Sequence, residues 1–193
     1  MKKIIFATGN EGKMKEVRAI MADCGYQIVS LKEEGLAPDI TEDGSSFEEN
    51  AVIKAREVMR LTGEIAMADD SGLEVDYLDK APGIYSARFM GENTSYDIKN
   101  QYILDRLKGV PEADRTARFV CAIACAFPDG RILTTRGTIE GQIGYSIAGE
   151  NGFGYDPIFY LPEFGMTTAE LTPEQKNRIS HRARALEAMK KLL

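Results

Sequence analysis

Residues 3–14 read KIIFATGNEGKM, and this stretch decides the fold class. Residues 3–7 form a short apolar run that is typical of a buried strand. After a turn at residues 8–12, apolar residues recur at the spacing of one helix face: Met14, Val17, Ile20 and Met21. A strand, a tight turn and a helix in succession are typical of α/β proteins. We therefore predict an α/β fold whose first helix begins at about Gly12.

The rest of the chain adds predicted helices and strands to this opening. A helix is expected after Ser46, because Glu49 follows at the spacing of a capping box. A short apolar strand at 65–68 is expected to end at Asp69 and Asp70, where the chain turns through Ser71. Residues 116–127 predict a strand that turns at residues 128–130 into a partner at 131–139, so that the sheet is mixed. Further helices are expected at 95–108, after Thr172 and after Ser180.

Composition narrows the class of protein. The chain has 193 residues, of which 44% are hydrophobic, enough for a single domain with a real core. A net charge of −6 argues against a basic nucleic-acid face, so we expect no nucleic-acid partner. No apolar stretch has the length of a membrane span or of a signal-peptide core. The three cysteines have neither metal nor disulfide spacing, and we expect a reduced, cytoplasmic protein.

The first candidate site is the turn Thr8-Gly9-Asn10-Glu11-Gly12-Lys13, which lies between a strand and a helix N-terminus. Free backbone N–H groups and the positive end of the helix dipole favour anions there, and a lysine adds a charge. The turn resembles a P-loop but has Ala7 where that motif has glycine and Met14 where it has serine or threonine. An ordinary strand–helix turn with a solvated lysine explains the segment equally well.

The second candidate is acidic. Asp69-Asp70 stands at the predicted end of a strand, where α/β sheets place ligands, and Glu42 lies in the preceding loop. In a strand the two neighbouring aspartates point to opposite faces, so at most one faces a given cleft. Carboxylates from separate segments, completed by phosphate oxygens, are the usual ligands of Mg²⁺. The alternative is a solvated turn.

Three further groups of residues are weaker signals on their own. Asn50 and Lys54 share a helix face, although a plain surface pair is the favoured explanation. In the glycine-rich segment 149–157, Phe153 could stack on a base and Asp156 could accept a hydrogen bond from one; a β-turn with a buried phenylalanine is the alternative. His181 is the only histidine of the chain, and Arg182 follows it. A lone histidine is more often a structural than a catalytic residue.

Six motifs in register make the chain similar to one family. It resembles the inosine/xanthosine triphosphate pyrophosphatases over about residues 3–186. The motifs are Thr8-Gly9-Asn10-x-x-Lys13-x-x-Glu16, Phe47-x-x-Asn50-Ala51-x-x-Lys54-Ala55, Ala68-Asp69-Asp70-Ser71-Gly72-Leu73, Ala81-Pro82-Gly83-Ile84-Tyr85-Ser86-Ala87-Arg88, Gly152-Phe153-Gly154-Tyr155-Asp156-Pro157 and Ile179-Ser180-His181-Arg182. Ala183 stands where many relatives have glycine, which would shift the helix start slightly.

The resemblance implies a fold and an activity. The fold is an elongated mixed β-sheet flanked by helices, with residues 1–193 forming one two-lobed domain around a central substrate cleft, and the protein is a homodimer. The activity is Mg²⁺-dependent hydrolysis of dITP, ITP and XTP between the α- and β-phosphates, which gives the monophosphate and pyrophosphate. Such enzymes remove deaminated purines from the nucleotide pool.

The resemblance also implies roles for individual residues. Asp70 is the proton acceptor for the attacking water and, with Glu42, the Mg²⁺ ligand. The phosphates are held by Thr8, Gly9, Asn10, Glu11, Gly12, Lys13, Lys54 and Ser71. The base is held by Phe153, Gly154, Tyr155, Asp156, Lys176, His181 and Arg182.

Two other functions compete with this one. A related pyrophosphatase could act on modified pyrimidine or other nucleotides, and a sensor module could bind a nucleotide without hydrolysing it. A sensor has no need for a carboxylate-held metal or a base, so Glu42 and Asp70 argue against it. A kinase-type phosphotransferase is disfavoured by the failed P-loop match.

Overall fold

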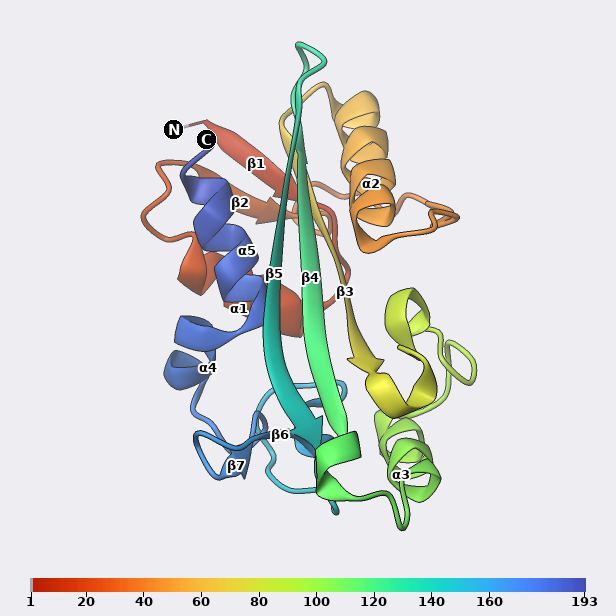
Figure 1. The fold of residues 1–193 in the computed structure, drawn as a ribbon. Coiled ribbons are helices and arrows are strands. Elements are labelled where there is room, and N and C mark those ends of the chain that lie inside the picture. Colours follow the sequence, from red (N-terminus) through yellow and green to blue (C-terminus); the bar gives the residue numbers. More distant parts are fainter. Residues whose placement is uncertain (1) are drawn as a thin grey trace. The chain divides into compact units, whose positions relative to one another are not determined.

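A computed structural model describes residues 2–193 of the chain and shows a mixed α/β fold, as the sequence predicts (Figure 1). The strands of the described residues follow the order β2-β1-β3-β4-β5-β6-β7 in one sheet. Strand β1 (Lys3–Phe6) pairs in parallel with β2 (Gln27–Ser30) and with β3 (Ala66–Val75). Strand β6 (Phe159–Leu161) pairs antiparallel with both β5 (Ile132–Ile143) and β7 (Met166–Thr167).

The chain divides into two compact units, and each is described by itself. Unit 1 comprises residues 1–71, 121–137 and 181–193, and unit 2 comprises residues 72–120 and 138–180. Unit 1 holds β1, β2 and the first part of β3, together with α1 (Glu11–Ile20), α2 (Phe47–Thr62) and α5 (His181–Lys190). Unit 2 holds β6 and β7, together with α3 (Tyr96–Arg106) and α4 (Pro173–Ile179). Strand β4 (Thr116–Ala126) and β5 run through both units.

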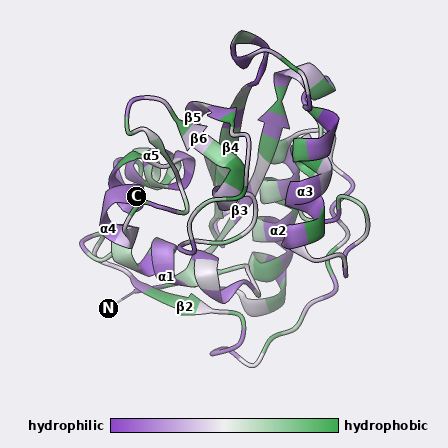
Figure 2. Cartoon of the chain, turned by 90° about the horizontal axis from the view of Figure 1, so that it is seen from below, coloured by the Kyte–Doolittle hydropathy of each residue, from purple (hydrophilic) through white to green (hydrophobic). Residues whose placement is uncertain are grey.

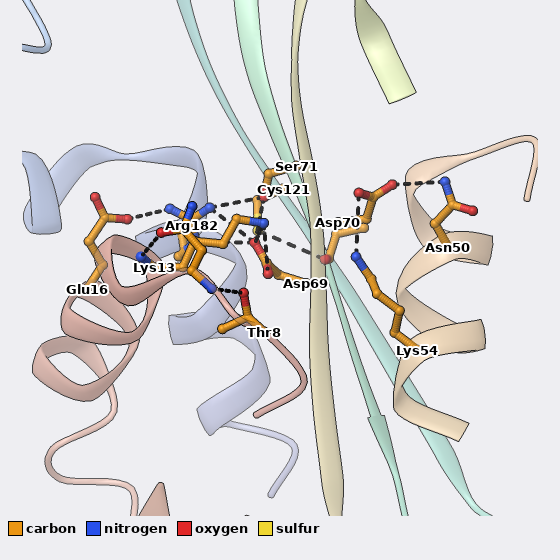
Figure 3. Close-up of polar contacts among 12 residues, drawn as sticks. Thr8, Lys13, Glu16, Asn50, Lys54, Asp69, Asp70, Ser71, Cys121 and Arg182 are labelled. Atoms are coloured by element: carbon orange, nitrogen blue, oxygen red, sulfur yellow. Dashed lines mark hydrogen bonds and ion pairs between the residues drawn. The ribbon is translucent and has the colours of Figure 1, made fainter. Parts of the chain in front are cut away.

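Helices cover both faces of the strands in unit 1. Helices α1 and α5 lie on one face of β3 and α2 lies on the other (Figures 1 and 3). The core between α1, α5 and the strands includes Phe6, Met14, Val17, Met67, Cys121, Ile123, Leu186 and Met189. Strand β4 is largely in the hydrophobic colour in Figure 2, and nearly all of its side chains are buried. Cys121 and Cys125 are buried there with free thiols.

Unit 2 has its own core. It is built from the second part of β3, from β4 and β5, and from α3 and the segments around β6, and it includes Leu73, Val75, Ile103, Leu107, Phe119, Ile143, Ile158 and Phe159. Short 3-10 turns occur at Asp76–Leu78, Gly83–Tyr85, Glu112–Asp114 and Asp156–Ile158. No helix of residues 2–193 combines the length and the apolar character of a membrane span.

The helix starts follow the capping signals of the sequence. Ser46 accepts a hydrogen bond from the backbone N–H of Glu49 at the start of α2, at 3.1 Å. The Glu49 carboxylate bonds Ser45 instead of completing the box. At α4 the capping box is complete, because Thr172 and Gln175 bond each other's backbone N–H groups. The last helix begins at His181, next to the predicted Ser180.

The prediction that the strand at residues 65–68 ends at Asp69-Asp70 is wrong. Strand β3 continues through both aspartates, Ser71 and Gly72 to Val75. The polar residues stay in the extended strand because Asp69 and Asp70 have charged partners on the two faces of β3. A run of hydrophilic residues therefore does not mark a turn here. The sequence analysis also missed β2, β6 and β7, which have only two to four residues each and too few positions to show a period.

Candidate active site

The turn before α1 is already shaped as an anion-binding site. The Asn10 side chain caps the helix by accepting a hydrogen bond from the backbone N–H of Lys13 at 3.0 Å. The Thr8 hydroxyl accepts from the backbone N–H of Asn10 at 3.1 Å, which tightens the turn. Gly9 has open space where a side chain would be, so a ligand can approach its backbone. Free N–H groups of the first helical turn, with the dipole behind them, favour a phosphate group.

Asp69 points from β3 towards α1 and α5 (Figure 3). Its carboxylate lies 3.1 Å from the Lys13 ammonium and 3.1 Å from the Arg182 guanidinium, and it accepts a hydrogen bond from the Ser71 hydroxyl at 2.8 Å. The residue is only 1% exposed. Burial alone would raise the pKa of Asp69, but Lys13 and Arg182 outweigh burial and hold this pKa well below its usual range. Asp69 is therefore a buried carboxylate that stays ionised.

Asp70 points to the opposite face, towards α2 (Figure 3). Its carboxylate accepts a hydrogen bond from the Asn50 amide at 3.1 Å and lies 3.8 Å from the Lys54 ammonium. Asn50 is itself buried and fixed, because its amide oxygen accepts from the backbone N–H of Gly44. Burial raises the pKa of Asp70, and the attraction of Lys54 does not cancel this effect. A raised pKa makes the ionised carboxylate a better proton acceptor.

Glu42 and Asp70 share one cation. The Lys54 ammonium lies 2.9 Å from the Glu42 carboxylate as well as 3.8 Å from that of Asp70. Burial would lower the pKa of Lys54, but Asp69, Asp70 and Glu42 outweigh it and raise this pKa. Two carboxylates around one ammonium mark a place where positive charge is stabilised, so the donor set fits a hard cation such as Mg²⁺.

That cation would not be held by the protein alone. Across residues 2–193, no three histidine, cysteine, aspartate or glutamate side chains gather into a group that could hold a metal ion. Mg²⁺ usually keeps several waters and binds through one or two carboxylates plus substrate phosphates. The pair of carboxylates Glu42 and Asp70, completed by phosphate oxygens of a substrate, would match this mode.

In unit 2, Asp156 organises the glycine-rich segment. Its carboxylate accepts hydrogen bonds from the backbone N–H of Phe153 at 2.9 Å, from the Thr168 hydroxyl at 2.8 Å and from the Lys176 ammonium at 2.6 Å. Asp156 is 2% exposed. The Lys176 ammonium also lies 4.8 Å from the centre of the Phe153 ring, within cation–π range. The three predicted base-site residues Phe153, Asp156 and Lys176 are therefore brought together.

The neighbouring residues of that segment are tied to other parts of unit 2. The Tyr155 hydroxyl donates to the backbone carbonyl of Ser86 at 2.6 Å, and the Tyr96 ring packs edge-on against Tyr155. The buried Asn100 amide donates to the Gly154 carbonyl at 3.0 Å. None of the partner residues Tyr96, Asn100 and Thr168 was expected in a site from the sequence. Among the partners, only Ser86 lies within one of the six motifs.

His181 and Arg182 open α5 and belong to unit 1. Arg182 is 1% exposed; its guanidinium pairs with Glu16 and Asp69 and donates to the Ser71 hydroxyl at 3.2 Å. Contact between this side chain and a base would require it to leave two carboxylates. Removing one partner of a buried ion pair costs about 3–5 kcal/mol.

A pocket of about 340 Å³ lies in unit 2, away from the predicted residues. Its lining includes Glu112, Arg115, Tyr145, Tyr160 and Glu170, and none of the side chains chosen from the sequence. Arg115 is buried and bonds the backbone carbonyls of residues 107, 143 and 144. The guanidinium thereby fastens neighbouring segments of the chain, which is a structural role.

Comparison with known proteins identifies close relatives. The model of the Ham1 family matches residues 4–192. A dITP/XTP pyrophosphatase of Desulforamulus reducens is 51% identical over 191 residues, covering 99% of this chain and 95% of that one. A dITP/XTP pyrophosphatase of Bacillus subtilis is 46% identical, with coverage of 100% and 98%. Among solved structures, a HAM1 protein from Coxiella burnetii has a TM-score of 0.89 at 41% identity, with coverage of 100% and 98%. The Staphylococcus aureus Ham1 protein has a TM-score of 0.88 at 41% identity, with coverage of 99% and 97%.

The packing of Gly152 against Asp156 gives a stability prediction. Both Gly152 and Gly154 have positive φ, 73° and 67°, so alanine is strained at either position. A Cβ at Gly152 would also overlap the Asp156 carboxylate, whereas one at Gly154 would meet only the Tyr96 ring at 3.7 Å. We expect Gly152→Ala to lower the free energy of unfolding by about 1–3 kcal/mol more than Gly154→Ala. Urea unfolding measures both; equal losses would contradict the close contact.

Proposed function

This chain belongs to the Ham1 family, and on that premise we propose that it hydrolyses non-standard purine nucleoside triphosphates such as dITP, ITP and XTP to the monophosphate and pyrophosphate. The observation that carries the proposal is the likeness, at about half of all positions and over almost the whole chain, to proteins named dITP/XTP pyrophosphatase. The hydrolysis removes deaminated purines from the nucleotide pool. Unit 1 supports it with an anion-binding turn, a buried ion-pair network and a carboxylate with a raised pKa.

The triphosphate would be bound by the turn of residues 8–13. The backbone N–H groups of the turn and the Lys13 ammonium would face the phosphate oxygens, and Lys54 on α2 and Ser71 on β3 would add contacts. Glu42 and Asp70 would hold Mg²⁺. When bound, that ion neutralises the charge that builds up on the phosphate oxygens during hydrolysis. The local cations explain how a protein with a net charge of −6 accepts a polyanion.

Asp70 would act as the proton acceptor. A water oxygen attacks the α-phosphorus, the bond from that phosphorus to the bridging oxygen breaks, and pyrophosphate leaves. The water proton goes to the Asp70 carboxylate. Asn50 orients this carboxylate through its 3.1 Å hydrogen bond, and burial raises the pKa of Asp70 towards the range where a general base works.

The base would be held by residues 153–156 and by Lys176, all in unit 2. Arg182, which the resemblance also assigns to the base, is paired with Glu16 and Asp69 and would serve the ion-pair network of unit 1 instead. Phe153 stacks on any purine and gives affinity without choice. Lys176 is a donor that suits the O6 acceptor of hypoxanthine and xanthine and opposes the amino group of adenine. The burial and three hydrogen bonds of Asp156 favour a positioning role, in which it fixes Lys176 and the backbone of Phe153.

The setting of this activity is also part of the proposal. We expect a homodimer that works in the cytoplasm on free nucleotides and has no nucleic-acid or membrane partner. The support is the net charge of −6, the buried free thiols of β4 and the implied properties of the family. Sedimentation at increasing protein concentration would show the dimer.

The position of bond cleavage can be read from the products. Hydrolysis of dITP with Mg²⁺ in ¹⁸O-labelled water should give pyrophosphate and labelled dIMP, because water attacks the α-phosphorus. Adding EDTA should abolish turnover. The measurement is mass spectrometry of both products. Orthophosphate and dIDP as first products, or full turnover in EDTA, would contradict the proposal, and binding without any turnover would indicate a sensor.

The two adjacent aspartates should differ in their effect on turnover. Asp70→Asn removes the proton acceptor and is expected to lower kcat by about 10²–10⁴, the usual worth of a general base. Asp69→Asn should lower kcat less, because Asp69 faces Lys13 and Arg182 instead of the water. Asp43→Asn, at an exposed site beside Glu42, is the control and should keep wild-type kcat. Near wild-type turnover of Asp70→Asn at saturating Mg²⁺ would remove both roles given to Asp70.

The Asp156–Lys176 pair should control the choice of base. Asp156→Asn releases the ammonium and Lys176→Met removes it, so each variant should narrow the ratio of kcat/KM for ITP over ATP by about tenfold or more, equivalent to ~1.4 kcal/mol. Steady-state kinetics on both nucleotides measures the ratio. Glu174→Gln, at an exposed site on the same helix, should leave it unchanged. An unchanged ratio in both pair variants would show that this pair does not select the base.

A further inference from the structure

Four charges of alternating sign form a buried chain in unit 1. Glu16 pairs with Arg182, Arg182 pairs with Asp69 at 3.1 Å, and Asp69 pairs with Lys13 at 3.1 Å (Figure 3). The side chains of Arg182 and Asp69 are 2% and 1% exposed, whereas that of Lys13, at the end of the chain of charges, is 19% exposed. The side chain of Glu16, at the other end, is 12% exposed, so the network is open only at its two ends. Lys13 is the end that lies at the turn of residues 8–13.

The bonds of Asp69 leave it little capacity for a further ligand. Both of its oxygens lie within 3.2 Å of the Lys13 ammonium. One oxygen also accepts from the Ser71 hydroxyl and from two nitrogens of Arg182, at 2.8, 3.1 and 3.4 Å. Asp70, on the other face of the strand, has a single amide donor and a distant ammonium. The carboxylate of Asp69 is therefore largely occupied by donors within unit 1, whereas that of Asp70 can accept further hydrogen bonds.

We propose that Asp69 is a positioning residue, anchored by Arg182 and Glu16, that holds the Lys13 ammonium at the phosphate-binding turn and takes no direct part in metal binding. This inference rests on the proposed function, because it assumes that the turn of residues 8–13 holds the phosphates of the substrate.

The anchor matters because a lysine side chain is flexible. Four rotatable bonds let an ammonium sample many positions, and fixing such a side chain costs conformational entropy. The ion pair with Asp69 fixes the Lys13 side chain before a substrate binds, so substrate binding does not have to order it. Arg182 holds Asp69 from the other side, and its planar donor fork is itself fixed by Glu16. An incoming phosphate then meets an ammonium that is already in place, which strengthens phosphate binding without touching the base.

The test is a double-mutant cycle on a probe that carries no base. Binding of sodium tripolyphosphate in EDTA is measured by calorimetry for the wild type, Asp69→Asn, Lys13→Met and the double variant. Asp69→Asn should weaken binding about tenfold, the worth of one charge-assisted hydrogen bond. In the Lys13→Met background the same change should alter binding less than about twofold, because Asp69 acts through Lys13. An additive cycle would overturn the proposal.

Two controls separate positioning from other roles. Inosine carries the base without phosphate, and its binding, followed by ligand-observed NMR, should be the same for Asp69→Asn and the wild type. A merely structural loss would weaken both probes and would overturn the proposal. The Mg²⁺ concentration for half-maximal turnover should also be unchanged in Asp69→Asn, whereas a clear increase would make Asp69 a metal ligand.

A second variant covers the case in which Asp69→Asn does not fold. Glu16→Gln removes the outer anchor of Arg182 and should weaken tripolyphosphate binding in the same direction and less strongly, again only when Lys13 is present. Unchanged tripolyphosphate binding would overturn the proposal. Hydrolysis of dITP to dIMP and pyrophosphate by the wild type is checked first, so that a failure of the proposed function is recognised separately.

Discussion

The alternation of side chains along β3 is the constraint on which the site depends. Two consecutive carboxylates in a strand must point to opposite faces. In unit 1 this sends Asp69 towards α1 and α5 and Asp70 towards α2 (Figure 3). The extended backbone therefore gives each aspartate its own set of partners.

Electrostatic balance explains how these buried charges are tolerated. An isolated buried carboxylate costs several kcal/mol, and a close ion pair recovers this only with good geometry and further hydrogen bonds. Asp69 meets that requirement through Lys13, Arg182 and Ser71. Asp70 meets it only in part, through Asn50 and a more distant Lys54. The weaker compensation leaves Asp70 with spare acceptor capacity, which a general base and a metal ligand both need.

Short local motifs in the sequence predicted much of the fold and part of the candidate site. The strand–turn–helix of residues 3–14, the caps at Ser46 and Thr172 and the hairpin at 128–130 are short-range signals, and all of them lie where the pattern indicates. The continuation of β3 and the full set of Asp156 partners depend on contacts between residues far apart in the chain. Thr168 and Asn100 carry no local signature, and only the folded unit 2 shows what they bond.

The environments of Asp69 and Asp70 drive their pKa values apart in a way that assigns their chemistry. Burial acts on both carboxylates in the same direction, so it cannot distinguish them. The cations do: two lie within 3.2 Å of Asp69, while the nearest ammonium to Asp70 is at 3.8 Å and is shared with Glu42. A carboxylate with a strongly lowered pKa is a poor proton acceptor, and one with a raised pKa is a better one. Two chemically identical neighbours thus acquire opposite pKa shifts through the helices that each faces, which supports the anchoring and base roles proposed for them.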